Sequence, residues 1–203
     1  MRVEPVTLTG RVVRLEPLRL DHAEALFAAG QEPAIWRYMP IDPSGSVDEI
    51  RAWITDALAE REAGRQMPFV TSDLASGQVI GSTRYLTIVP KDYGLEIGWT
   101  WLTPRVQRSG VNTECKYLLL RHAFEKLGAI RVALKTDSRN MISQRAIERL
   151  GAVREGVLRK ATIIQRDGYQ RNTVMYSVTD DEWPAVRARL ENFMLEHDAA
   201  PGA

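Results

Sequence analysis

The sequence has few cysteines, few histidines and no long apolar run, and each absence excludes a class of protein. One cysteine, Cys115, among 203 residues excludes an internal disulfide framework and a paired-cysteine metal site. The three histidines are scattered and suggest no metal triad, so we expect no metal cofactor. No apolar stretch approaches the roughly 20 residues of a membrane helix, and the N-terminus has no signal-peptide pattern. We therefore expect a soluble, cytoplasmic protein that does not bind a membrane.

Charge of one sign is not in excess either. The chain has 27 lysines and arginines against 26 aspartates and glutamates, a net charge of +1, so we expect no nucleic-acid partner bound through bulk charge. Hydrophobic residues make up 44% of the chain, which is enough for a buried core. Because no repeat, linker or low-complexity segment divides the chain, we expect residues 1–203 to form one domain with a frayed tail from about residue 196.

The order of the predicted elements indicates a mixed α/β sheet. Three consecutive strands joined at hairpin scale favour an antiparallel meander, and the later strand–helix–strand alternation favours crossover units. Ser46 has the capping-box spacing to Glu49, Gly151 supplies a helix stop, and Thr179 is the expected N-cap of the last helix. The predicted elements are a strand (11–18), two helices (20–30 and 46–64), three strands (66–74, 77–89 and 93–102), a helix (111–128), a strand (130–137), a helix (140–151), two strands (152–164 and 171–178) and a helix (179–195).

A basic turn with one glycine joins the third strand of the meander to the strongest helix, in the stretch LTPRVQRSGVNTECK. A helix N-terminus offers about four unpaired amides and a positive dipole end, which suit phosphate. Gly110 would let the backbone approach a ligand closely, and Arg105 and Arg108 could add charge-assisted contacts. The GxGxxG and GxxxxGK[ST] patterns are absent. The turn alone is therefore compatible with an anion site or with an ordinary strand–helix connection carrying solvated arginines.

The neighbourhood of this turn resembles the GCN5-related N-acetyltransferase (GNAT) family. Residues 107–112, QRSGVN, are similar to the family's (Gln/Arg)-x-x-Gly-x-(Gly/Ala) acyl-CoA pyrophosphate loop, with Asn112 in place of a small residue. LEIGWTWL before it and NTECKYLLLRHAFEKLGAIRVALKTDSRNMISQRAIERLGAVREGVLR after it resemble the RimJ/RimL branch of ribosomal-protein N-terminal acetyltransferases. The resemblance implies the GNAT fold, with about seven mostly antiparallel strands, a splayed centre and flanking helices. It also implies acetyl-CoA as cofactor and a primary amine as acceptor, and it allows a homodimer.

The resemblance further implies a set of coenzyme-binding residues from the strand, the loop and the two helices that follow. In family structures the strand before the loop pairs with the pantetheine arm, and one of its amides faces the thioester oxygen. The implied coenzyme-binding residues are Trp99, Thr100, Trp101, Leu102, Arg105, Gln107, Arg108, Ser109, Gly110, Val111, Asn112, Thr113, Asn140 and Ser143. Asn140 could equally serve as a helix N-cap.

Two residues are the catalytic candidates. Glu96 could act as the base, directly or through water, if the cleft buries it; a solvent-facing strand glutamate and bulk water as base are the alternatives. The resemblance implies that Ser143 contacts the coenzyme sulfur, whereas the tyrosine that many family members use as acid is replaced by Ile147. This replacement leaves open a non-catalytic acyl-CoA-binding or sensor protein.

The acceptor site is expected between the N-terminal helices and the turn RDGYQRN, where family members diverge. Trp36, Tyr38 and Arg84 are its candidate residues, with core packing an equal alternative for Trp36. The acceptor could be a protein or peptide N-terminus or a small-molecule amine.

Overall fold

The computed structural model describes residues 1–164 and 166–199. Its strands are β1 (Leu8–Thr9), β2 (Val13–Pro17), β3 (Met67–Asp73), β4 (Val79–Val89), β5 (Gly94–Leu102), β6 (Arg131–Asp137), β7 (Val153–Ile164) and β8 (Tyr169–Thr179). Its helices are α1 (Ala23–Ala29), α2 (Pro33–Trp36), α3 (Val47–Glu62), α4 (Val111–Glu125), α5 (Met141–Leu150) and α6 (Trp183–Ala199), with 3-10 turns at Leu20–His22, Pro90–Asp92 and Pro104–Val106. The tail expected to fray from about residue 196 lies at the limit of the described residues and stays a prediction.

The strands form one eight-stranded sheet in the order β1-β2-β3-β4-β5-β6-β8-β7. Neighbouring strands are antiparallel, except that β5 and β6 are parallel because α4 carries the chain back between them. This mixed, mostly antiparallel sheet confirms the predicted fold class. The expected count of about seven strands is one short because β1 has only two residues. Its place depends on pairing Leu8 with Leu15, which no local pattern signals.

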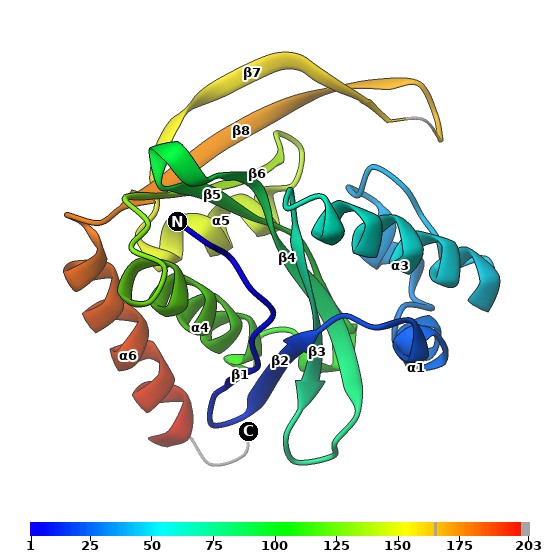
Figure 1. Cartoon of the computed structure of the whole chain (residues 1–203), viewed down its shortest axis with the longest axis horizontal. Coiled ribbons are helices and arrows are strands. Elements are labelled where there is room, and N and C mark those ends of the chain that lie inside the picture. Colours follow the sequence, from blue (N-terminus) through cyan, green and yellow to red (C-terminus); the bar gives the residue numbers. More distant parts are fainter. Residues whose placement is uncertain (165, 200–203) are drawn as a thin grey trace.

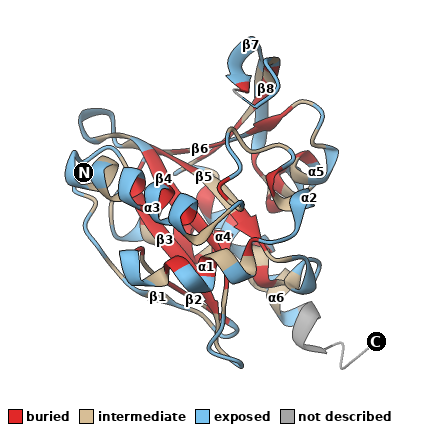
Figure 2. Cartoon of the chain, turned by 90° about the vertical axis from the view of Figure 1, so that its right-hand side faces the viewer, coloured by how far each residue is buried: buried red, intermediate tan, exposed pale blue. Residues whose placement is uncertain are grey.

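Helices cover both faces of the sheet (Figure 1). α4, α5 and α6 enclose the larger apolar cluster on one face, and α1, α2 and α3 enclose a second cluster on the other. The hairpin of β7 and β8 arches over the top of the sheet (Figure 1), and β7 is exposed along most of its length (Figure 2). Within the described part of the chain, no helix combines the length and apolarity that crossing a membrane requires.

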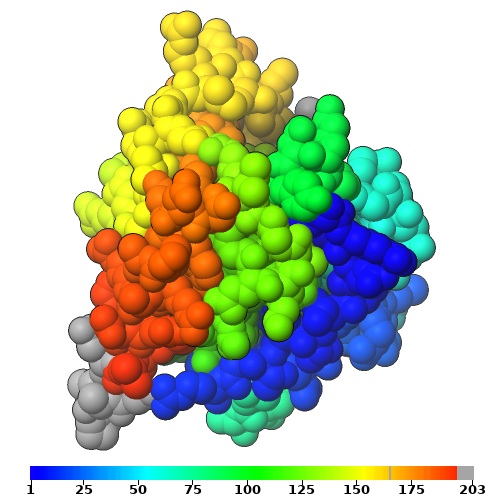
Figure 3. Space-filling view, turned by 60° about the vertical axis from the view of Figure 1, so that its left-hand side comes forward, coloured from blue at the N-terminus to red at the C-terminus, as the bar shows by residue number. Residues whose placement is uncertain are grey.

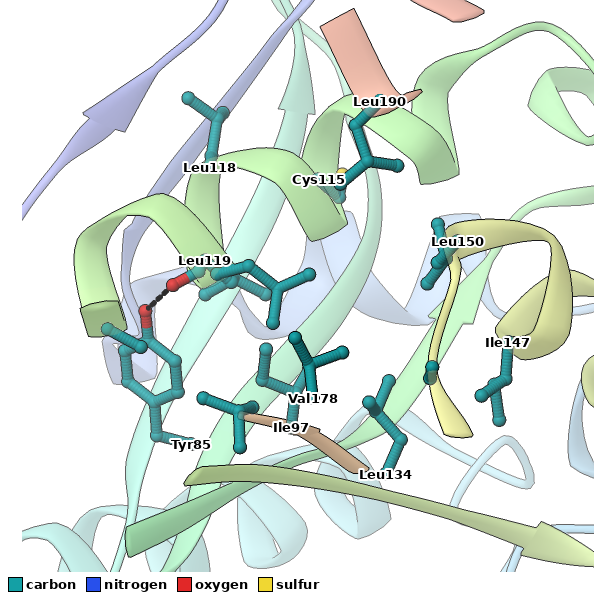
Figure 4. Packing of buried hydrophobic residues seen from close by; sticks show 14 of the residues in the cluster. Tyr85, Ile97, Cys115, Leu118, Leu119, Leu134, Ile147, Leu150, Val178 and Leu190 are labelled. Carbon is teal, nitrogen blue, oxygen red and sulfur yellow. Dashed lines mark hydrogen bonds between the residues drawn. The ribbon is translucent and has the colours of Figure 1, made fainter. Parts of the chain in front are cut away.

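The larger core forms where α4 packs on the central strands (Figure 4). Leu119 is fully buried, and its carbonyl accepts a hydrogen bond of 2.6 Å from the hydroxyl of Tyr85 on β4. Cys115, on the same helix, is 1% exposed, and burial raises the pKa of its thiol to about 12. Cys115 is therefore a small buried residue of the core, and a thiol that stays protonated is a poor nucleophile.

A buried carboxylate fastens the N-terminal segment to α4. Glu114 is 4% exposed and accepts hydrogen bonds from the backbone N–H groups of Arg11, Val12 and Val13 at 2.7, 2.8 and 2.9 Å. Gly10 passes so close that a Cβ there would lie 2.5 Å from the Glu114 carboxyl carbon. Figure 3 shows the N-terminal segment, in blue, lying against the green surface of α4.

Local capping signals are confirmed at two helices and wrong at a third. The Ser46 hydroxyl accepts a hydrogen bond from the Glu49 N–H at the start of α3, and Gly151 ends α5 with a φ of 102°. Thr179 is not an N-cap, because α6 begins at Trp183 and Thr179 is the last residue of β8. The short helix α2 was also missed, because four residues give too little periodicity to detect.

Candidate active site

The sheet opens between β5 and β6. The two strands pair from Gly94 opposite Arg131 to Ile97 opposite Leu134, and there the pairing ends. Beyond this point Gly98–Leu102 pairs with β4 alone, and the end of β6 pairs with β8 alone. The carboxyl half of β5 therefore presents unpaired backbone N–H and C=O groups toward the opening, as the predicted splayed centre requires.

A β-bulge shapes the free half of β5. Ser82 of β4 lies opposite Trp101 and Arg84 lies opposite Gly98, so β5 has one residue more than β4 over this interval. Trp99 lies within this bulge and has a φ of 50°, a left-handed conformation that is costly for a bulky residue. Such a bulge turns one backbone amide away from the ladder, at the edge where β5 has no partner.

The loop after β5 ends in a group of free amides. α4 starts at Val111, after Gly110 in the left-handed conformation at φ 81°. After the N–H of Gln107, which bonds the Pro104 carbonyl, the next N–H that bonds a backbone carbonyl is that of Glu114, which bonds Gly110. Within the described residues, no protein acceptor takes the N–H groups of residues 108–113. These N–H groups and the positive end of α4 suit a phosphate group.

Side chains around this loop brace the backbone. The Ser109 hydroxyl donates to the Val106 carbonyl at 2.5 Å, and the Gln107 amide donates to the Leu102 carbonyl at 3.3 Å. Arg105 donates to the Gln78 side chain at 2.7 Å, and Arg108 is exposed with a φ of 63°. Arg105 and Gln107 therefore hold the loop to the sheet.

The opposite wall of the opening is the start of α5. Asn140 caps this helix, since its Oδ1 accepts the Ser143 N–H at 3.0 Å, and the Ser143 hydroxyl is partly exposed. β5 and β6 are parallel, so the N-termini of α4 and α5 lie at the same end of the strand pair. Arg149, in the last turn of α5, donates to Thr113 in the first turn of α4 at 3.1 Å, so the two helices are in contact.

Glu96 lies just before the opening and is 4% exposed. Its Oε2 is 3.0 Å from the Lys135 ammonium. Its Oε1 is buried without a partner and lies 3.1 Å from where a Cβ would stand at Gly98. Burial raises the pKa of Glu96, and the Lys135 charge partly opposes the rise. The alternative of a solvent-facing glutamate is wrong, and the free oxygen points along β5 toward its unpaired half.

The acceptor candidates lie on the α1–α3 face of the sheet, as Glu96 does. Trp36 is fully buried against Trp101 at 5.1 Å between ring centroids, and its Nε1 donates to the Gly30 carbonyl. It therefore packs behind the site. Tyr38 is partly exposed, with the Arg139 guanidinium 5.9 Å from its ring. Arg84 is buried and stacks between two tryptophans.

Three charged residues of this face were not named as site candidates from the sequence, although Arg166 and Arg171 belong to the turn RDGYQRN that was expected at the acceptor site. Lys135 shares the face of Glu96 because of the β5–β6 register, and alternation along residues 130–137 could have indicated it. Arg171 of β8 is 7% exposed with an unpartnered Nε. Arg166, at the tip of the β7–β8 hairpin, donates to the carbonyls of Trp36 and Arg37 at 3.4 and 3.3 Å. The hairpin tip and α2, which lie 130 residues apart in the chain, thus meet beside the opening.

No group of three or more histidine, cysteine, aspartate or glutamate side chains in the described part of the chain is placed to hold a metal ion. The site consists of an opened strand pair beside a helix N-terminus with free amides. Such an arrangement suits an extended ligand that ends in phosphate.

Comparison with known proteins identifies the family. The model of the acetyltransferase (GNAT) domain matches residues 13–153. A Thermus thermophilus protein assigned as an acetyltransferase is 42% identical, with a TM-score of 0.85 over 95% of this chain and 99% of that one. A GCN5-related N-acetyltransferase from Brucella melitensis is 30% identical, with a TM-score of 0.89 over 99% and 88%. The chain therefore belongs to the GNAT family of N-acetyltransferases.

The RimJ/RimL branch is also among the structural neighbours. RimJ of Mycobacterium smegmatis, solved in complex with CoA-disulfide, has a TM-score of 0.81 over 93% of this chain and 95% of its own. Its sequence is 22% identical, so this likeness shows the shared fold. Comparison of the sequence with curated proteins gave no match.

Proposed function

We propose that the protein transfers the acetyl group of acetyl-CoA directly to a primary amine, on a protein or peptide N-terminus or on a small molecule. The observation that carries this proposal is the parting of β5 from β6 after Ile97, next to the free amides of residues 108–113. The complex of M. smegmatis RimJ with CoA-disulfide supports it, because that protein shares the fold.

The residues of the opening fit the coenzyme. The amides of residues 108–113 bind the pyrophosphate, and the unpaired edge of Gly98–Leu102 binds the pantetheine arm in the manner of an added strand. Asn112 is partly exposed on the first turn of α4, where its carboxamide can also donate to a phosphate oxygen. When bound, the coenzyme supplies an acetyl group activated as a thioester. The bulge at Trp99 directs one β5 amide to the thioester oxygen and stabilises the charge that develops there.

Glu96 accepts the proton of the acceptor amine. Its free Oε1 lies beside the parting of the strands, and its raised pKa brings it closer to the pH at which an amine must be deprotonated. Lys135 holds the carboxylate through Oε2 and leaves Oε1 for the amine or for a bridging water.

Ser143 stabilises the departing thiolate of the coenzyme. Its hydroxyl stands on the first turn of α5, across the opening from β5, where the helix dipole also favours negative charge. Ile147, at the position of the family's frequent tyrosine, is 6% exposed and belongs to the core, so it offers no proton.

The buried Ile147 also favours the second candidate, an acyl-CoA-binding protein without catalysis. Release of coenzyme thiol from acetyl-CoA upon addition of an amine panel separates the two candidates. Calorimetry with coenzyme A tests both, because absence of binding would exclude each of them.

Glu96→Gln tests the base. We expect the rate of the unaltered protein to fall as pH drops through the raised pKa of Glu96, because only the carboxylate accepts a proton. The variant should lose about 100-fold or more in kcat. The matched control is Glu62→Gln, which alters an exposed carboxylate on α3. An unchanged rate across the pH range in Glu96→Gln would exclude Glu96 as the base.

Ser143→Ala tests the thiolate contact. We expect a lower kcat with little change in the calorimetric affinity for coenzyme A, because the interaction strengthens only as charge develops on sulfur. Weakened affinity at an unchanged kcat would make Ser143 a binding residue alone.

A further inference from the structure

Arg84 is a cation buried without an ion-pair partner among the described residues. It is 4% exposed, and its guanidinium carbon lies 4.6 Å from the ring centroid of Trp53 and 4.7 Å from that of Trp99. Burial lowers the pKa of Arg84 to about 10, although the charges of Asp56 and Glu60 act in the opposite direction. A guanidinium in this position is costly to the free protein unless a partner completes its hydrogen bonds.

One edge of this guanidinium has no acceptor. Nη1 donates to the Gln66 side chain at 2.9 Å, whereas Nε and Nη2 are buried without a partner. Nε and Nη2 form the edge that binds both oxygens of a carboxylate in a bidentate pair. Nε1 of Trp53, which stacks on Arg84, is also buried without a partner. The cluster offers only N–H donors, so the missing partner is a group that supplies acceptor oxygens.

Arg84 and Glu96 stand on one face of the sheet, on the neighbouring strands β4 and β5. Arg84 is opposite Gly98 and Leu86 is opposite Glu96, so Arg84 and Glu96 form a diagonal pair across β4 and β5. Cross-strand diagonal neighbours are about 7–8 Å apart. Gly98 has no side chain here, and Leu86 leans over it with Cδ2 3.0 Å from where a Cβ of Gly98 would stand. An amine at Oε1 of Glu96 and a carboxylate at Arg84 can therefore belong to one small molecule or to one peptide end.

We propose that the amine acceptor carries a carboxylate close to its primary amine, and that Arg84 binds this carboxylate through Nε and Nη2. The inference rests on the proposed acetyl transfer. The carboxylate neutralises the buried guanidinium, and the indoles of Trp53 and Trp99 fix its plane. The same chemistry comes from a free amino acid or from an acidic side chain near a peptide N-terminus.

Matched acceptors test the proposal on the unaltered protein. One pair is an α-amino acid and its carboxamide; the other is a short peptide with aspartate or asparagine at its second position. We expect kcat/KM to favour the carboxylate member of at least one pair by on the order of 10- to 100-fold, the range of a charge-assisted hydrogen-bond pair. The pair that shows the preference identifies the source of the carboxylate.

Variants then assign the preference to Arg84. In Arg84→Gln the ratio between the members of the pair should fall toward one, and in Arg84→Lys, which keeps the charge without the fork, it should be intermediate. Arg51→Gln, which removes an exposed arginine of α3, should leave the ratio unchanged. If Arg84→Gln does not fold, the ratio measured on the unaltered protein still decides.

The outcomes separate the two proposals. Acetylation of both members of each pair at equal kcat/KM would overturn the inference and leave acetyl transfer intact. Acetylation of no amine in the panel would overturn the proposed function and this inference together. If Arg84→Gln still prefers the carboxylate acceptor, a group other than Arg84 binds the carboxylate.

Discussion

Lys116 allows a prediction in which stability depends on pH. Its side chain is 5% exposed on α4, and its ammonium donates to the Thr100 hydroxyl at 2.6 Å. Burial lowers the pKa of Lys116 from 10.5 to about 8. Because the folded pKa lies below the unfolded one, folding is penalised where the lysine must be charged. The stability that depends on neutral Lys116 is complete above about pH 10.5 and is lost as pH falls through about 8.

Lys116→Met replaces the amine by an apolar side chain of similar length. The difference between 10.5 and about 8 corresponds to a folding cost of about 3 kcal/mol at pH 7, which the variant avoids. The variant also loses the hydrogen bond to Thr100, which lowers its stability by about 1 kcal/mol. We therefore expect the variant to be more stable by about 2 kcal/mol at pH 7 and to lie within about 1 kcal/mol of the unaltered protein at pH 10.

Urea unfolding at the two pH values, followed by tryptophan fluorescence, measures the difference. Lys91→Met, at an exposed lysine, is the control and should change stability little at either pH. A variant that is less stable at pH 7, or a difference that is the same at pH 7 and pH 10, would refute the reasoning.

Two further predictions concern stability. Glu114→Gln should lower the free energy of unfolding by about 2–3 kcal/mol, because a carboxamide cannot accept all three backbone N–H groups and its own NH₂ would be buried. Urea unfolding measures this change, and a variant as stable as the unaltered protein would contradict the prediction. Gly81→Ala should lower the melting temperature by about 10 °C or prevent folding, because its Cβ would lie 2.1 Å from the Trp101 carbonyl oxygen. Gly94→Ala, whose Cβ meets nothing closer than 3.9 Å, is its control and should melt near the unaltered protein.

Local signals in the sequence predicted most of the elements. Ser46 and Gly151 mark helix ends through hydrogen bonds to residues a few positions away, so their roles can be predicted from the local sequence alone. The order of strands and helices was likewise sufficient for the mixed sheet. The two-residue β1 could not be predicted, because it exists only through its partner β2.

The electrostatics of the site depend on contacts that the sequence does not display. Alternation left Glu96 in a cleft or on a solvated face, and its burial beside Lys135 of the neighbouring strand excludes the solvated face. Arg84 was a candidate for acceptor binding, but its unpartnered edge follows from the positions of Gln66 and Trp53 on other elements. The meeting of Arg166 with Trp36 depends on the arch of an entire hairpin.

The three N–H groups that surround Glu114 have a consequence for shortened chains. Residues 1–13 contain none of the candidate site residues, and a chain that starts at Arg14 would keep the entire loop of residues 103–110. It would nevertheless leave the carboxylate of Glu114 buried with no donor from Arg11, Val12 or Val13. Glu114 directly follows Thr113, the last of the free amides. N-terminal truncation should therefore loosen the end of α4 that is proposed to bind the pyrophosphate, from a position far away in the sequence.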